Sequence, residues 1–163
     1  NTAKQAEAGA RAFGYPPTGV RGYGPHRAAQ YGLRADEYFT QINDLVSFIP
    51  LIETTEAVDN IDEILEVDGV DTFIIGPVDL SISLGVPFDY EGPVFQDAQA
   101  KLAEAAQRAG KKAGLGVYRP ASDPQSLKRA IADGFSLVLA GGDEPFLAAG
   151  CQHLAQIRTD LGY

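Results

Sequence analysis

Residues 46–79 read VSFIPLIETTEAVDNIDEILEVDGVDTFIIGPVD and contain two apolar runs with a helical pattern between them. The runs at residues 46–52 and 72–75 have the length and composition of buried strands. Between them, Glu53 to Glu56 form a helix-start signature, and apolar residues then recur at helical spacing until Gly69. The stretch therefore predicts a strand–helix–strand unit, in which the two strands are parallel.

The same alternation continues along the chain, with a helix, a strand, a helix, a strand and a last helix. We expect a Ser-, Gly- and Pro-rich loop after Pro77 and a leading helix with capping-box spacing at Thr2 and Gln5. The expected ranges are 2–13 for the leading helix, then 93–109, 112–118, 123–133 (with Leu127, Ala130 and Ile131 facing inward), 135–140 and 146–161.

Two α/β architectures fit this order, a doubly wound open sheet and part of a (β/α)₈ TIM barrel. No Gly-x-Gly-x-x-Gly motif follows an expected strand, which leaves a dinucleotide-binding sheet without support. A whole barrel needs about 250 residues. We therefore expect residues 1–163 to form a single domain covering about the last four βα units of a (β/α)₈ barrel, with the N-terminal half absent.

The composition excludes several classes of protein. Apolar residues make up 45% and charged residues 21% of the 163 residues, as in a globular domain, and the formal net charge is −9. Such an acidic chain repels phosphate, so we expect neither nucleic acid nor membranes as partners. The single cysteine, Cys151, fits a reducing cytoplasm. The chain starts at Asn1 and has no Met, which also predicts a segment of a longer protein.

Two acidic residues follow neighbouring strands. Glu53 ends the first strand, and Asp79 lies three residues beyond Gly76, which ends the second. Adjacent strands are about 4.8 Å apart, so both carboxylates can reach a shared point and hold a hard divalent cation. The alternative is that Glu53 and Asp79 only cap the helices that begin there. Spacing alone leaves both readings open.

Several motifs resemble the class II pyruvate aldolases of the 4-hydroxy-2-oxoheptanedioate aldolase (HpcH/HpaI) type. The similarity extends from Thr2 to about Ala149, and its two acid-bearing motifs occur in the family's order and spacing. The motifs are YPPTGVRG at 15–22, LIETTEAVDNI at 51–61, VD at 70–71, IGPVDLS at 75–81 and LG at 84–85.

The resemblance implies a metal-dependent aldolase that reversibly cleaves a 4-hydroxy-2-oxo acid to pyruvate and an aldehyde. Glu53 and Asp79 would hold Mg²⁺ or Mn²⁺, with Co²⁺ as a third candidate, and the backbone N–H groups of Val78 and Asp79 would bind the pyruvate carboxylate. Leu51 stands where the family often has Gln, which removes a polar contact to the usual substrate.

The resemblance also places the catalytic base, a His with an acidic helper, and an Arg in the missing half. We therefore assign no catalytic residue here and expect the fragment alone to be inactive. It further implies a homo-oligomer, commonly a hexamer that exchanges the last helix.

Other readings of single residues remain open. Arg21 could orient an anionic substrate or pin its glycine-flanked loop through a salt bridge. We expect surface or packing roles for His26 and His153, and turns at residues 118–120 and 141–142 in preference to a substrate or phosphate contact.

Two rival functions remain. A Schiff-base aldolase would need a Lys at the active mouth, yet Lys111 and Lys112 precede a strand and so lie at the opposite end. A non-catalytic barrel homologue could bind a 2-oxo acid or act only in assembly.

Overall fold

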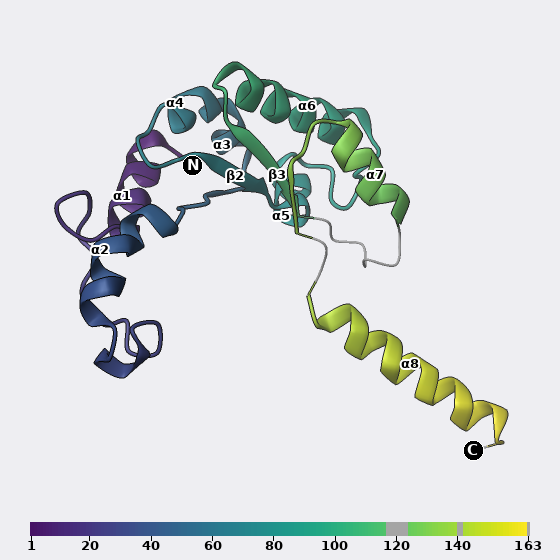
Figure 1. Ribbon diagram of the computed structural model, residues 1–163. Helices are drawn as coiled ribbons and strands as arrows, with labels where there is room; N and C mark the ends of the chain where they lie inside the picture. The colour runs from purple at the N-terminus through teal and green to yellow at the C-terminus, as the bar shows by residue number, and fades with distance from the viewer. Residues whose placement is uncertain (117–123, 140–141, 163) are drawn as a thin grey trace.

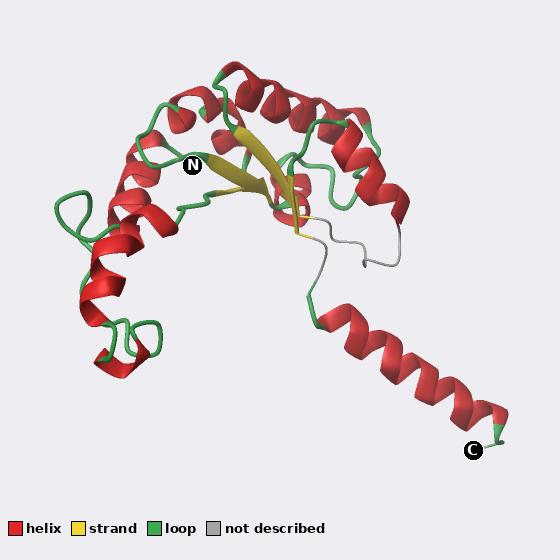
Figure 2. Cartoon of the chain, in the orientation of Figure 1, coloured by secondary structure: helices red, strands yellow, loops and turns green. Residues whose placement is uncertain are grey.

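A computed structural model describes residues 1–116, 124–139 and 142–162. Its centre is a parallel four-stranded sheet in the order β1-β2-β3-β4, drawn as yellow arrows in Figure 2. A doubly wound sheet reverses its strand order at a switch point, whereas neighbours in a barrel follow the chain. The sequential order therefore supports the barrel. The strands are β1 (Leu51–Ile52), β2 (Thr72–Ile75), β3 (Lys112–Gly116) and β4 (Leu137–Leu139).

The two faces of the sheet are buried very differently. Ile52 at the end of β1 is 1% exposed, whereas Leu51 on the other face is 54% exposed. In β2, Phe73 and Ile75 are fully buried while Ile74 between them is only half-buried. Figure 1 shows α4, α6 and α7 along the same side of the sheet. Helices outside and an uncovered inner face are what a segment of a (β/α)₈ barrel presents, so the expected fold class is confirmed.

The helices connect and flank the strands (Figure 1). In Figure 1, α8 extends away from the sheet, and none of its residues is buried. None of the described helices is both long and apolar enough to cross a membrane. The helices are α1 (Ala3–Phe13), η1 (Gln30–Gly32), α2 (Ala35–Leu45), α3 (Thr55–Asp59), α4 (Ile61–Leu65), α5 (Pro77–Ser83), α6 (Pro93–Arg108), α7 (Pro124–Ala132) and α8 (Glu144–Asp160).

The structure corrects three local expectations in the first half of the chain. The first strand is only Leu51–Ile52, preceded by an isolated bridge from Phe48 to Val70, because Pro50 has no N–H for a continuous ladder. The expected single helix after Thr54 is divided at Asn60 into α3 and α4. The expected loop after Pro77 is instead the helix α5.

The other expected elements are present with slightly different ends, and one residue inside them differs in its burial. Helix α1 has the full capping box between Thr2 and Gln5. In α7, Ala130 is buried as expected, but Ile131 is exposed, which contradicts its predicted inward position. Residues 117–118, 123 and 140 of the expected elements lie outside the described ranges.

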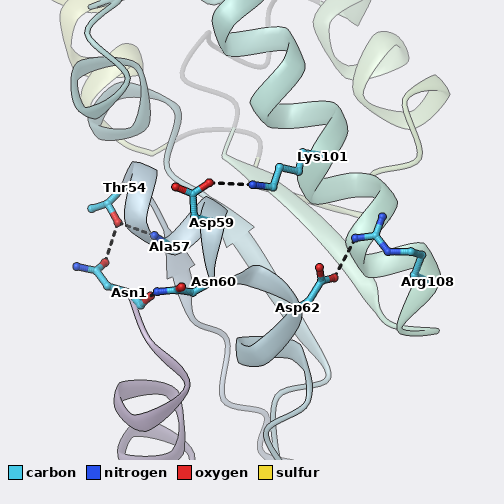
Figure 3. Close-up of polar contacts among 8 residues, drawn as sticks. All are labelled: Asn1, Thr54, Ala57, Asp59, Asn60, Asp62, Lys101 and Arg108. Carbon is cyan, nitrogen blue, oxygen red and sulfur yellow. Dashed lines mark hydrogen bonds and ion pairs between the residues drawn. The ribbon is translucent and has the colours of Figure 1, made fainter.

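Two ion pairs join α6 to the short helices over the sheet (Figure 3). Lys101 Nζ lies 2.9 Å from Asp59 Oδ1 at the end of α3, and Arg108 Nη2 lies 2.9 Å from Asp62 Oδ1 in α4. All four side chains are largely exposed, so each pair contributes only about 0–1 kcal/mol. The apolar contacts beneath them therefore provide most of the attachment of α6.

Replacing Leu102 tests that contribution. Leu102 in α6 is fully buried in the main hydrophobic core, so Leu102→Ala should lower the free energy of unfolding by about 2–5 kcal/mol. The matched control is Leu33→Ala, because Leu33 is 87% exposed and its replacement should change stability by less than about 0.5 kcal/mol. Urea unfolding followed by circular dichroism measures both, and equal effects would contradict the assigned core.

Candidate functional site

The strand register places Glu53 beside Gly76. Ile52 pairs with Ile75, and the Gly76 N–H donates to the Ile52 carbonyl at 3.0 Å, so Glu53, the residue directly after β1, lies beside Gly76. A Cβ added to Gly76 would lie 3.0 Å from Glu53 Oε2 and 3.2 Å from Glu53 Cβ. The missing side chain at Gly76 therefore leaves the space that the Glu53 carboxylate occupies.

Asp79 is carried by the first turn of α5, directly after β2. Gly76 is the N-cap of this helix and Pro77 its first residue, a position where the missing proline N–H removes no helical hydrogen bond. The N–H groups of Val78 and Asp79 precede the first helical hydrogen bond, which runs from Leu80 N to Gly76 O at 3.0 Å. This turn thus presents one carboxylate and two backbone donors at the carboxyl end of the sheet.

Glu53 and Asp79 line the same open groove, which has a volume of about 740 Å³. Asp143 and Glu144, at the start of α8, also line it. Among the described lining residues there is no Lys, Arg or His, so the charged groups at this groove are all acidic. Its apolar walls include Leu51, Ile74, Val78 and Leu139.

The alternative, in which Glu53 and Asp79 only cap helices, is not supported by the hydrogen bonds of the described residues. Thr54, not Glu53, caps α3, because its side chain accepts from Ala57 N at 3.1 Å (Figure 3). Helix α5 has no side-chain cap, although Asp79 in its first turn still interacts favourably with the helix dipole. Within the described ranges, neither the Glu53 nor the Asp79 carboxylate forms a hydrogen bond or an ion pair.

Such a groove fits a hard divalent cation. Carboxylate oxygens are the ligands that Mg²⁺ and Mn²⁺ prefer, and Glu53 and Asp79 have no competing donor among the described residues. A cation would also relieve the repulsion between the acidic side chains that share the groove. No cluster of three or more His, Cys, Asp or Glu side chains suited to a metal occurs in the described part of the chain. A cation held here by two side chains would keep positions open for substrate oxygens.

Arg21 lies elsewhere. Its guanidinium carbon sits 5.1 Å from the centroid of the Tyr15 ring, in an aromatic cluster that also contains Tyr23 and Phe39. Arg21 is not among the residues that line the groove, and its substrate-binding role stays a prediction. Pinning of the loop is supported, but through the Tyr15 ring instead of the expected salt bridge, since Arg21 forms none with the residues described.

The remaining candidates are also outside the groove. His26 and His153 are exposed and do not line it. The Lys111 ammonium donates to the carbonyls of Leu65 and Val70, near the amino end of β2, as expected for a lysine far from the active mouth. No described lysine therefore serves a Schiff-base mechanism in this groove. Residues 118–120 and Gly141 lie outside the described ranges, whereas Gly142 lines the groove.

Sequence reasoning missed two features of the site. It gave Asp143 and Glu144 no role in the site, although their place after the fourth strand already put them at the same edge as Glu53. It also gave no role to Gly76. The sequence does contain the relevant feature. If the two strands are aligned so that Ile52 pairs with Ile75, Gly76 lies opposite Glu53.

The family model and the similar curated proteins point to the same family of aldolases. The model of the HpcH/HpaI aldolase/citrate lyase family matches residues 1–144. The chain is 37% identical to the 2-keto-3-deoxy-L-rhamnonate aldolase of Klebsiella pneumoniae, over 98% of this chain and 59% of that protein. It is also 37% identical to the 4-hydroxy-2-oxo-heptane-1,7-dioate aldolase of the same organism, over 94% of this chain and 57% of that protein.

Solved structures show the same fold. A HpcH/HpaI aldolase/citrate lyase family protein from Burkholderia cenocepacia superposes with a TM-score of 0.81 and 30% identity, over 96% of this chain and 62% of that one. A HpcH/HpaI aldolase from Desulfitobacterium hafniense gives a TM-score of 0.80 and 29% identity, over 96% and 60%. The chain thus spans about half to three-fifths of the length of the proteins it matches.

The division of roles between Glu53 and Thr54 can be tested by stability. Thr54→Ala should lower the free energy of unfolding by about 1 kcal/mol, because it removes the cap of α3. Glu53→Gln should change it by less than about 0.5 kcal/mol, because the carboxylate forms no hydrogen bond with a described residue. Urea unfolding of the two variants gives the comparison, and a larger loss in Glu53→Gln would restore the capping reading.

Proposed function

Because this chain belongs to the HpcH/HpaI aldolase/citrate lyase family, we propose that the protein is a metal-dependent aldolase. It would reversibly cleave a 4-hydroxy-2-oxo acid to pyruvate and an aldehyde. The observation that carries the proposal is the pair Glu53 and Asp79, which line one groove and have no hydrogen-bond partner in the described chain. The printed names of two relatives, aldolases of 2-keto-3-deoxy-L-rhamnonate and of 4-hydroxy-2-oxo-heptane-1,7-dioate, support the class of substrate.

Each residue of the groove has a role in this proposal. Glu53 and Asp79 hold Mg²⁺ or Mn²⁺, and Co²⁺ is a third candidate; the cation supplies positive charge against the negative charge that develops on the keto oxygen. The free N–H groups of Val78 and Asp79 orient the substrate carboxylate at the start of α5. Leu51, two residues before Glu53, forms part of the apolar wall of the groove and limits the access of water to it.

We also propose that residues 1–163 are one domain, the C-terminal half of a (β/α)₈ barrel. Strands β1 and β4 each pair with one neighbour only among the described residues, and the inner face with Leu51 and Leu139 is exposed. The other half would cover that face and supply the base and the arginine implied by the family resemblance. The fragment alone should therefore be inactive. A cytoplasmic location belongs to the same proposal, because Cys151 has no second cysteine in this chain to pair with.

Proton exchange at the methyl group of pyruvate tests the function in the complete protein. The protein should exchange these protons in D₂O with Mg²⁺ or Mn²⁺ and stop when a chelator is added. Glu53→Ala and Asp79→Ala should each lower the rate at least about 100-fold, because each removes one of two protein ligands. Exchange is followed by proton NMR.

Glu56→Ala is the matched control, since Glu56 is an exposed acid of α3 outside the groove and its loss should leave the rate unchanged. Exchange that survives the chelator, or both ligand replacements, would contradict the metal site. Cation binding without exchange would instead favour the non-catalytic homologue.

We further propose that the protein is a homo-oligomer, a hexamer by resemblance to the family, in which α8 packs on a second copy. Four of the large apolar side chains of α8 are at least 41% exposed, and its sequence stripe predicts one apolar face. Water-exposed apolar area of this kind is costly in an isolated helix. The residues are Phe146, Leu147, Leu154 and Ile157.

Leu154→Glu tests the assembly. The change places a charge on the apolar face of α8 and should shift the complete protein toward smaller species in light scattering coupled to size exclusion. The control is Gln156→Glu, in the same helix, which should leave the mass unchanged. An identical mass for Leu154→Glu and wild type would contradict packing through this face.

A further inference from the structure

Helices α3 and α5 are joined by a pair of hydroxyl side chains. The Thr55 N–H donates to Ser83 Oγ at 2.9 Å, and Thr55 Oγ1 donates to the Ser83 carbonyl at 3.0 Å. The two hydroxyl oxygens are themselves 3.2 Å apart. These contacts cross 28 positions of sequence, so they connect two separate βα segments.

Thr55 and Ser83 are near Glu53 and Asp79, respectively, in the amino-acid sequence. Thr55 is the first residue of α3 and lies two positions after Glu53. Ser83 is the last residue of α5 and lies four positions, or about one helical turn, after Asp79. The contact therefore ties the segment that carries one carboxylate to the helix that carries the other.

A buried serine in α5 lies between Asp79 and Ser83 and fastens this helix to the chain that follows it. Ser81 is fully buried, and its hydroxyl donates to the Val78 carbonyl at 2.7 Å. The same oxygen accepts from the N–H of Phe88 at 3.1 Å, which fastens the following loop to the helix. Ser81 therefore links the residue before Asp79 to the loop that follows Ser83.

The exposure of Thr55 and Ser83 to solvent indicates that their contact affects the position of the helices more than the stability of the fold. Thr55 and Ser83 are both exposed, so water can replace their hydrogen bonds at little cost in stability. Water cannot replace their geometric effect, because a hydrated Thr55 is free to move relative to Ser83. Glu53 and Asp79 have no hydrogen bonds of their own to other described residues that would keep them in place.

We propose that Thr55 and Ser83 form a positioning clamp that sets the placement of Glu53 relative to Asp79 for cation binding. The clamp rests on the proposed function, because it presupposes that Glu53 and Asp79 hold a divalent cation. Neither Thr55 nor Ser83 touches the cation or the substrate, and each acts through its neighbouring acid.

Binding of Mn²⁺ to the complete protein, measured by electron paramagnetic resonance without substrate, tests the clamp. Thr55→Val and Ser83→Ala should each weaken binding about tenfold, the lower end of the range for residues behind metal ligands. The double variant should lose more than either single change, because each variant keeps one hydrogen bond that the other removes: Thr55→Val keeps the Thr55 N–H to Ser83 Oγ, and Ser83→Ala keeps the Thr55 Oγ1 to the Ser83 carbonyl. Thr55→Ser keeps the hydroxyl and should bind within about twofold of wild type.

Thr40→Val is the matched control. Thr40 Oγ1 donates to the carbonyls of Asp36 and Glu37 within its own helix, so its loss should leave Mn²⁺ affinity unchanged. Thermal unfolding should give similar midpoints for Thr55→Val, Ser83→Ala and wild type. An affinity loss that tracks a lowered midpoint, in either variant or in Thr40→Val, would overturn the clamp as a positioning device.

The outcomes separate the two proposals. If folded wild-type protein binds no Mn²⁺, the proposed function fails and the clamp fails with it. If wild type binds but Thr55→Val and Ser83→Ala bind equally well, only the clamp is overturned. Should Ser83→Ala not fold, Thr55→Val with its Thr55→Ser rescue decides the question alone.

Discussion

The pairing of β1 with β2 is the constraint on which the candidate site depends. Because Ile52 pairs with Ile75 and the Gly76 N–H reaches the Ile52 carbonyl, Glu53 must lie beside Gly76. A slip of one residue would turn Glu53 toward the buried face and Ile52 toward the groove. Burial of Ile52, Phe73 and Ile75 beneath the helices opposes such a slip, so the hydrophobic core and the acidic pair are determined by the same register.

The groove at the carboxyl end of the strands is acidic because its carboxylates have no basic side chain beside them among the described lining residues. The largely exposed pair Lys101 and Asp59 shows that this chain does neutralise acids on its helical surface. At the carboxyl end of the strands it does not, because Glu53, Asp79 and the two acids of α8 share a groove whose described lining contains no basic residue. A divalent cation bound there, as proposed, would place its positive charge among carboxylates that have no basic partner.

The sequence predicted what periodicity and residue spacing determine. The parallel order, the capping box of Thr2 and the strand at residues 72–75 all follow from local patterns. The positions of Glu53 and Asp79 directly after two neighbouring strands likewise predicted that both lie at one edge of the sheet, and both line one groove there. The short helix α5 could not be predicted in the same way, since its Ser- and Pro-containing sequence resembles a loop and it is held by the buried Ser81 hydroxyl.

Contacts between distant segments explain the other failures. Ile131 fits an inward helical stripe, yet it is exposed while Ala130 beside it is buried, so periodicity alone did not identify which residues of α7 the rest of the chain covers. The bond between Thr55 and Ser83 has no local signal either, as two exposed hydroxyl residues 28 positions apart resemble ordinary loop residues. Strand register therefore brings the two carboxylates to the same groove, whereas the clamp proposed for Thr55 and Ser83 depends on a side-chain contact between distant segments. That division explains why the sequence pointed to Glu53 and Asp79 but not to Thr55 and Ser83.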